Sequence, residues 1–162
     1  MSSSVSRPVA RWVGALASVL AVAVLFADPG TSTVVKGDDF LTAETTGVLN
    51  IEAGECFDDP VYSRRAADVV VYYRPCEETA DNQSFGFIRV ADGPFDRPAL
   101  TALAWTTCGQ RFARLWPDAA ARDLDLYPVL PTAETWADGD RTVMCVVYNP
   151  RGKLAGSALP RA

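Results

Sequence analysis

The chain has 162 residues, an apolar fraction of 49% and a formal net charge of −5, from 20 acidic and 15 basic side chains. This length fits one domain with appendages, and the acidic balance argues against nucleic acid as a partner, because phosphate binding needs a basic patch. The chain contains no histidine, which excludes Ser-His-Asp and Cys-His catalysis and removes the commonest general base and metal ligand.

The N-terminus combines a basic tail with an apolar run. Residues 1–11 are rich in serine and contain Arg7 and Arg11, and residues 12–27 carry no charge. This pattern predicts a transmembrane anchor or a signal peptide, and the anchor is favoured because no cleavage site fits well. In both cases the positive-inside rule predicts that Arg7 and Arg11 stay inside and that the C-terminal part of the chain is exported. We therefore expect a single-pass protein of the cell membrane with its C-terminal domain outside, with secretion as the alternative.

A polar stretch without a clear period follows the apolar run. Residues 28–46 are predicted to be a linker, so that the extracytoplasmic domain spans residues 47–162. Four strands are expected in its first half, over residues 48–52, 55–57, 68–74 and 83–91. The run of β-branched and aromatic residues at 68–74 indicates a strand that is covered on both faces.

One convincing helix is predicted over residues 97–116. Asp96 can cap its first turn, Pro98 is tolerated near that end, and Pro117 ends it. Its apolar face is formed by Leu100, Ala104, Cys108, Phe112 and Leu115.

The C-terminal part is predicted to return to β structure. Residues 124–130 form an edge strand broken by Pro128, residues 136–140 form a turn, and residues 142–148 form the most strand-like run. Strands, one helix and strands again predict an α+β fold, with a mainly antiparallel sheet packed on that helix, behind the N-terminal hydrophobic helix.

Four cysteines, Cys56, Cys76, Cys108 and Cys145, are widely spaced and include no Cys-x-x-Cys pair. A four-cysteine zinc site usually contains at least one close pair, so two disulfides are favoured. Disulfides indicate an oxidising compartment, in agreement with export.

Several short motifs resemble the septum-formation family, an extracytoplasmic domain typical of actinobacteria. They are Gly54-Glu55-Cys56-Phe57, Pro75-Cys76, Cys108-x-x-x-Phe112, Trp136-x-x-Gly139-Asp140-Arg141-x-Val143-x-Cys145 and Gly156-Ser157. The resemblance covers residues 47–160 and implies a link to cell division, but no established chemistry. Members of the family often carry a Pro-His segment after the second cysteine, where this chain has Glu77-Glu78-Thr79-Ala80-Asp81-Asn82.

The expected cross-links are Cys56–Cys145, which would tie the first strand to the last, and Cys76–Cys108, which would staple the helix to the sheet. Four cysteines allow three pairings, so peptide mapping must decide between them.

The densest group of acids surrounds the first two cysteines and consists of Glu55, Asp58, Asp59, Glu77, Glu78 and Asp81. These carboxylates could hold Ca²⁺ or act as an acid–base pair, but solvated loops are the favoured interpretation. The divergent loop after Cys76 is the expected binding site, with Glu77, Glu78, Asp81 and Asn82 as its candidate residues.

Residues 136–141 could form an exposed recognition edge. A structural role is favoured, with Gly139 in a positive-φ turn, Asp138 or Asp140 bonding the turn backbone, Arg141 pairing with one of these acids and Trp136 on the core. The aromatic residues Trp105, Trp116, Tyr72, Tyr73, Phe85 and Phe87 are expected in the core rather than on a sugar-stacking platform.

These features favour a non-enzymatic, disulfide-stapled interaction domain that binds a protein or envelope component and needs no cofactor or metal. The alternative is a secreted hydrolase with paired carboxylates, which is disfavoured because the chain has no histidine and no nucleophile motif.

Overall fold

A computed structural model of the chain describes residues 33–160. The basic tail and the predicted anchor or signal peptide at residues 12–27 lie outside the described residues. Within residues 33–160, no helix has both the length and the apolar character needed to cross a membrane.

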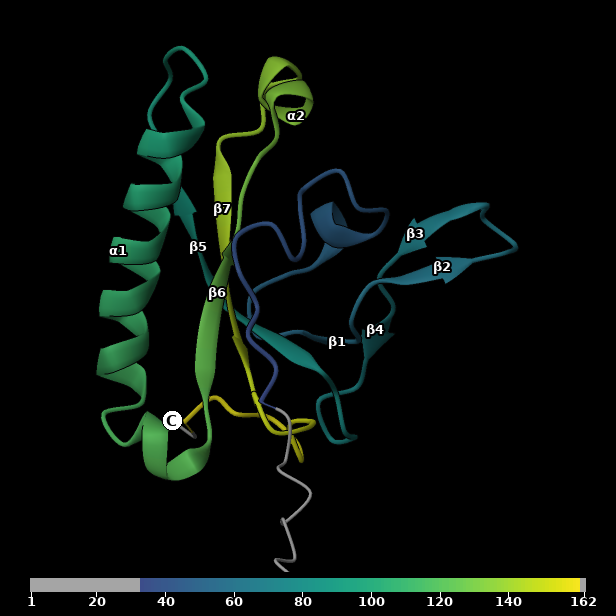
Figure 1. The fold of residues 1–162 in the computed structure, drawn as a ribbon, viewed down its shortest axis with the longest axis vertical. Coiled ribbons are helices and arrows are strands. Elements are labelled where there is room, and N and C mark those ends of the chain that lie inside the picture. Colours follow the sequence, from purple (N-terminus) through teal and green to yellow (C-terminus); the bar gives the residue numbers. More distant parts are fainter. Residues whose placement is uncertain (1–32, 161–162) are drawn as a thin grey trace, which may run out of the picture. The chain divides into compact units, whose positions relative to one another are not determined.

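A five-stranded antiparallel sheet forms the centre of the domain (Figure 1). In spatial order its strands are β4 (Tyr73–Arg74), β1 (Cys56–Phe57), β5 (Asn82–Arg89), β7 (Thr142–Tyr148) and β6 (Asp125–Val129). Six of the seven residues of β7 are buried. Burial at both even and odd positions means that both faces of this strand are covered.

Helix α1 (Arg97–Leu115) covers one face of the sheet, as the sequence predicts. The Asp96 carboxylate accepts a hydrogen bond from the Ala99 backbone N–H at 3.0 Å, which caps the first turn. The predicted apolar face is buried at Leu100, Ala104, Cys108 and Phe112. It packs against side chains of β5 and β7, including Ile88, Val143 and Cys145.

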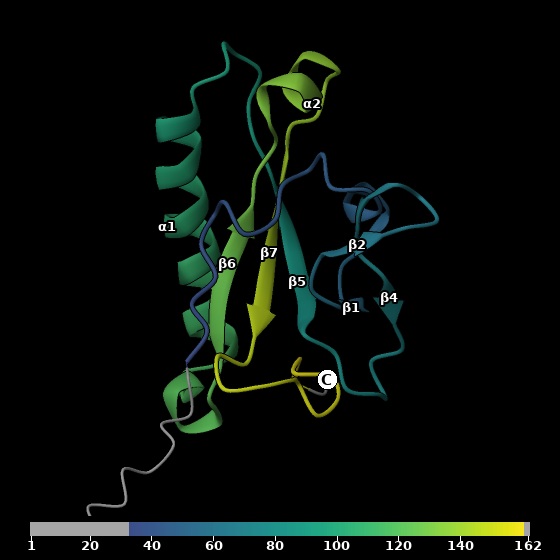
Figure 2. The ribbon, with the colours of Figure 1, turned by 45° about the vertical axis from the view of Figure 1, so that its right-hand side comes forward.

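The N-terminal segment, residues 33–51, covers the opposite face (Figure 2). Leu41 and Ala43 are only 1% and 5% exposed, so residues 33–46 are part of the domain and the predicted linker is wrong over this range. Residues 48–52 were expected to form a strand, but Val48–Asn50 is the 3-10 helix η1, which follows a left-handed Gly47 at φ +97°. Residues 48–52 are too few to distinguish a strand from a helical turn by their apolar pattern.

The expected strand at residues 68–74 is divided in two. β3 (Asp68–Val70) pairs with β2 (Val61–Ser63) in a separate two-stranded hairpin that projects from the domain, whereas β4 belongs to the main sheet. Between them, the Val71 N–H donates to the Thr46 carbonyl at 3.0 Å. The predicted cover on both faces is also wrong, because Val69, Tyr72 and Tyr73 are 44%, 49% and 60% exposed.

The C-terminal half agrees with the sequence more closely. β6 is an edge strand that contains Pro128, and β7 matches the predicted range. Two short helices were not expected, η2 (Ala119–Arg122) and α2 (Ala133–Ala137). α2 begins with a reciprocal capping box between Thr132 and Thr135.

The structure confirms two disulfides but not their predicted pairing. The bonds are Cys56–Cys76 and Cys108–Cys145, with Cα atoms 5.3 and 5.5 Å apart. β5 lies between β1 and β7, so Cys56 and Cys145 belong to strands about 10 Å apart, too far for a disulfide. The pairing error follows from the strand order, which the cysteine spacing does not reveal.

Each disulfide is predicted to stabilise a different part of the domain. Replacing Cys108 and Cys145 by alanine should lower the free energy of unfolding by about 4 kcal/mol and increase amide exchange in α1. Replacing Cys56 and Cys76 should cost about 3 kcal/mol and increase exchange in the β2–β3 hairpin, which lies inside that loop. Urea denaturation and hydrogen exchange measure both effects. Recovery of a Cys56–Cys145 peptide without reduction would contradict the observed pairing.

Candidate functional site

The four candidate residues of the predicted binding loop after Cys76 differ in their accessibility. Glu77 and Glu78 are exposed. Asp81 is bonded to Lys153 at 2.7 Å and accepts a hydrogen bond from the Asp59 N–H. Asn82 is fully buried as the first residue of β5. The four residues therefore do not form one accessible surface.

The aspartates of the predicted acid cluster serve as counter-charges for basic side chains. Asp58 pairs with Arg74 and with Lys153, and Asp59 pairs with Lys36. Within residues 33–160, no group of three or more metal-ligating side chains is arranged to hold an ion. This geometry favours a structural role for these acids over the Ca²⁺ site considered from the sequence.

Lys36 is the most unusual member of this network because its side chain is only 4% exposed. Its Nζ donates to an Asp59 carboxylate oxygen and, at 2.9 Å, to the Asn82 amide oxygen. It also lies over the rings of Phe40 and Tyr148, 4.8 and 5.0 Å from their centroids. We call Lys36, Asp59 and Asn82 the lysine clamp, since it joins the N-terminal segment to the base of the hairpin and to β5.

Burial controls the ionisation of the groups in this region. Desolvation lowers the pKa of Lys36, although the hydrogen bond and charge of Asp59 oppose the shift. Burial raises the pKa of Tyr127 well above its usual value, and its hydroxyl donates to the Asn82 amide oxygen at 3.0 Å. The neutral phenol is thus retained as a donor to the same oxygen that receives Lys36.

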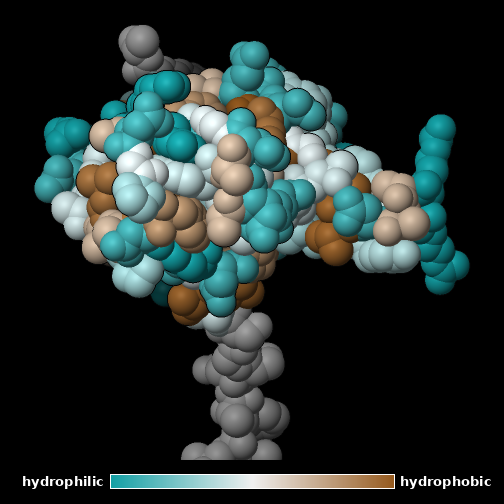
Figure 3. Space-filling model, turned by 90° about the horizontal axis from the view of Figure 1, so that it is seen from above, coloured by the Kyte–Doolittle hydropathy of each residue, from teal (hydrophilic) through white to brown (hydrophobic). Residues whose placement is uncertain are grey.

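The β2–β3 hairpin and the start of β4 carry a group of exposed apolar and aromatic side chains, which we call the hairpin surface. It consists of Val61, Tyr62, Val69, Tyr72 and Tyr73, which are 44–66% exposed. Figure 3 shows apolar residues along the projection and hydrophilic residues at its end. The core position expected for Tyr72 and Tyr73 is therefore wrong, whereas Trp116 is buried, and Phe85, Phe87 and Trp105 are partly buried and pack against the core clusters.

Two further features characterise the hairpin. Arg64 and Arg65 are exposed at its tip, and in the described part of the chain neither forms an ion pair. Among residues 33–160, β2 pairs with β3 alone, so its other backbone edge is free. An unpaired edge can accept a strand from another chain.

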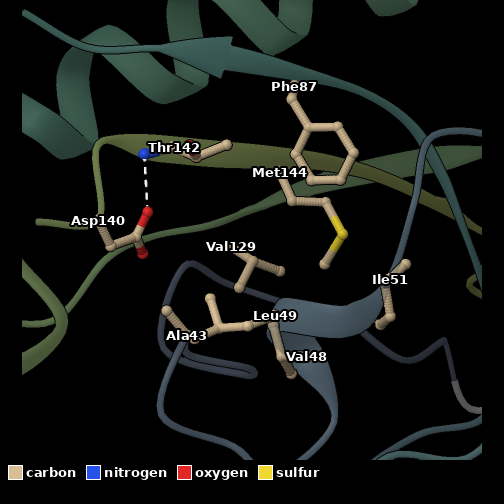
Figure 4. Close-up of a pocket in the computed structure, with 9 residues that line it drawn as sticks. All are labelled: Ala43, Val48, Leu49, Ile51, Phe87, Val129, Asp140, Thr142 and Met144. Atoms are coloured by element: carbon tan, nitrogen blue, oxygen red, sulfur yellow. Dashed lines mark hydrogen bonds between the residues drawn. The ribbon is translucent and has the colours of Figure 1, made fainter.

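The face of the sheet opposite α1 contains a pocket of about 320 Å³ (Figure 4). Seven of its nine lining residues are apolar. They come from the N-terminal segment with η1 and from three strands of the main sheet: Ala43, Val48, Leu49, Ile51, Phe87, Val129 and Met144. Thr142 and Asp140 complete the lining.

Asp140 belongs to the Trp136–Arg141 motif, for which a structural role was favoured. One carboxylate oxygen accepts a hydrogen bond from the Thr142 N–H at 2.9 Å, and Gly139 has the expected positive φ, +95°. Trp136 is 8% exposed, as predicted. Arg141 does not pair with Asp138 or the Asp140 carboxylate; its side chain stacks on Trp136 at 3.9 Å and pairs with Asp92 at 2.8 Å.

Sequence reasoning missed the lysine clamp and the pocket. Lys36 stands in a polar stretch without a period, and the pocket combines residues from four separate segments. The alternation of Leu41 and Ala43 around a polar residue was a weak signal that this stretch packs on the core.

Comparison of the chain with family models, curated proteins and solved structures gives no match. The resemblance to the septum-formation family therefore stays a prediction based on the motifs themselves.

The lysine clamp is predicted to be a major source of stability. Lys36→Met should lower the free energy of unfolding by about 2 kcal/mol, because Asn82 loses a buried donor and Asp59 its counter-charge. Lys153→Met is the matched control and should cost less than about 1 kcal/mol, since Lys153 is 47% exposed. Urea denaturation measures both, and equal losses would contradict a special role for Lys36.

The lowered pKa of Lys36 predicts the direction of a pH effect. Between that lowered pKa and the ordinary value of 10.5, the unfolded chain holds more protons on Lys36 than the folded chain. The Lys36 contribution to the free energy of unfolding therefore rises with pH in this window. The wild type should therefore gain stability relative to Lys36→Met as the pH rises toward 10.5. A relative loss measured by urea denaturation would show that Asp59 raises the pKa instead.

Proposed function

We propose that this chain is a non-enzymatic binding domain, anchored in the cell membrane with its globular part outside, whose β2–β3 hairpin binds an extended acidic segment of a partner protein. The observation that carries the proposal is the hairpin surface, a projecting patch of tyrosine and valine side chains with two arginines at its tip. The export pattern of residues 1–27 and the two disulfides support the location.

The composition of the hairpin surface favours a recognition role. Tyrosine provides a large, rigid contact with a polar end and is enriched at protein interfaces. Exposed Tyr62, Tyr72 and Tyr73 lie within a short stretch of chain together with two exposed valines. The Cys56–Cys76 disulfide closes the base of this excursion, which lowers the entropy lost on binding.

The free backbone edge of β2 favours a protein partner over a lipid surface. A partner strand can satisfy, by β-augmentation, the backbone N–H and C=O groups of β2 that point away from β3. The hydrocarbon of a membrane offers no such partners, and each unsatisfied group buried there is costly. Arg64 and Arg65 add a preference for carboxylates beside that strand.

The alternative function, hydrolysis by paired carboxylates, has less support. Burial alone would raise the pKa of Asp81, but hydrogen bonds from Lys153 and the Asp59 N–H, with the charges of Lys153 and Lys36, outweigh it and lower the pKa. A general acid needs the opposite shift. A role at the division site or in the envelope remains part of the proposal and is supported by the family resemblance.

Site-specific crosslinking in the native envelope is the direct test of the proposal. A photoreactive phenylalanine analogue at Tyr62 should give an adduct with one protein, attached to an acidic extended segment identified by mass spectrometry. The same analogue at Leu103, which is 42% exposed on α1, is the matched control and should give none. Arg64→Glu with Arg65→Glu should reduce the Tyr62 adduct about tenfold, because carboxylates on the partner are then repelled.

Two results would overturn this assignment. Adducts with lipid, unchanged by charge reversal, would identify the hairpin as a membrane contact. Equal adducts at Tyr62 and Leu103 would show that the hairpin has no special role. Circular dichroism and intact mass must first show that each variant is folded and has both disulfides.

A further inference from the structure

We propose that the pocket between η1 and the main sheet is a second binding site, which takes a small ligand with an apolar body and one ammonium group placed at Asp140. The proposal rests on the shape and chemistry of the pocket and is independent of the hairpin, since none of the hairpin-surface residues lines it.

The pocket has a carboxylate at one end and apolar side chains along the rest of its length. Figure 4 shows Asp140 at one end and Ile51 at the other, with Val129, Met144 and Phe87 between them. The apolar side chains would bury a hydrocarbon body, and the carboxylate would orient the polar end of the ligand. A volume of about 320 Å³ is at the lower limit for small-molecule sites and suits a ligand of about ten heavy atoms.

The Asp140 carboxylate has one oxygen that is hydrogen-bonded and one that has no partner within residues 33–160. Its first oxygen is held by the Thr142 N–H, so the orientation of the group is set before any ligand arrives. The second oxygen, Oδ2, is buried, and within residues 33–160 it has no hydrogen-bond partner. Leaving a buried acceptor unpaired costs stability, and a ligand that donates to it would remove that cost.

The neighbouring cation does not fill this role. The Arg141 guanidinium donates to the Trp136 and Asp140 carbonyl oxygens at 2.6 and 2.8 Å and to the Asp92 carboxylate. Its side chain is thus directed along the turn and against Trp136. A charge-assisted bond from an ammonium is stronger than one from a neutral hydroxyl, which is why the structure favours a cationic headgroup.

Three probes with the same chain and different headgroups test this inference: octylammonium, 1-octanol and octanoate. Calorimetry, with amide shifts to locate the site, should show octylammonium binding about tenfold more tightly than octanol, and octanoate most weakly. Asp140→Asn keeps an acceptor for the Thr142 N–H and removes the charge. This substitution should weaken the binding of octylammonium about tenfold and change the affinity for octanol by less than about twofold. Asp138→Asn, at an exposed position of the same turn, is the matched control.

A variant that fills the pocket provides a second test of the binding site. Ala43→Leu adds volume at a lining position and should abolish binding of octylammonium and octanol in a chain that still unfolds cooperatively. Equal affinities for ammonium and alcohol, or an unchanged preference in Asp140→Asn, would overturn the ammonium assignment. Absence of binding by all three probes, or shifts confined to other residues, would overturn the site itself.

Discussion

The ion pair of the lysine clamp, between buried Lys36 and partly exposed Asp59, is the interaction that fixes the N-terminal segment to the face of the sheet opposite α1. Lys36 comes from a segment with little regular structure, and its Nζ binds Asp59 and Asn82 below the rings of Phe40 and Tyr148. The clamp acts together with the apolar contacts of this segment, which supplies three of the ten buried residues of one core cluster, Leu41, Val48 and Ile51, and one wall of the pocket. A desolvated charge is costly, so its partners must all be in place.

The two disulfides stabilise two other parts of the domain. Cys108–Cys145 fixes α1 to strand β7, which pairs with both β5 and β6, and so secures one face of the sheet. Cys56–Cys76 closes the excursion that contains β2 and β3 and fixes the base of the hairpin. With the lysine clamp holding the opposite face, the domain can present an exposed hairpin and a partly open pocket without losing its core. The stable core and the cross-linked base of the hairpin allow the hairpin itself to keep its apolar side chains exposed.

Long elements with a clear pattern were predicted well. α1 begins and ends within one residue of its expected range, and β7 matches its predicted residues, since each has a sustained apolar period and a cap or turn at its ends. Short elements were predicted poorly: η1 was expected as a strand, and residues 68–74 were expected as one strand rather than two. A run of three residues carries too little periodicity to separate these states.

The sequence by itself determined the α+β class, the main helix, the buried Trp136 and the presence of two disulfides, because each depends on local composition or spacing. The tertiary structure decided which cysteines pair, which tyrosines are exposed, that Lys36 is buried and that Asp140 faces an apolar pocket. These properties depend on strand order and on contacts between distant segments, such as Lys36 with Asn82. Local pattern does not encode such contacts, and the proposed pocket is built from them.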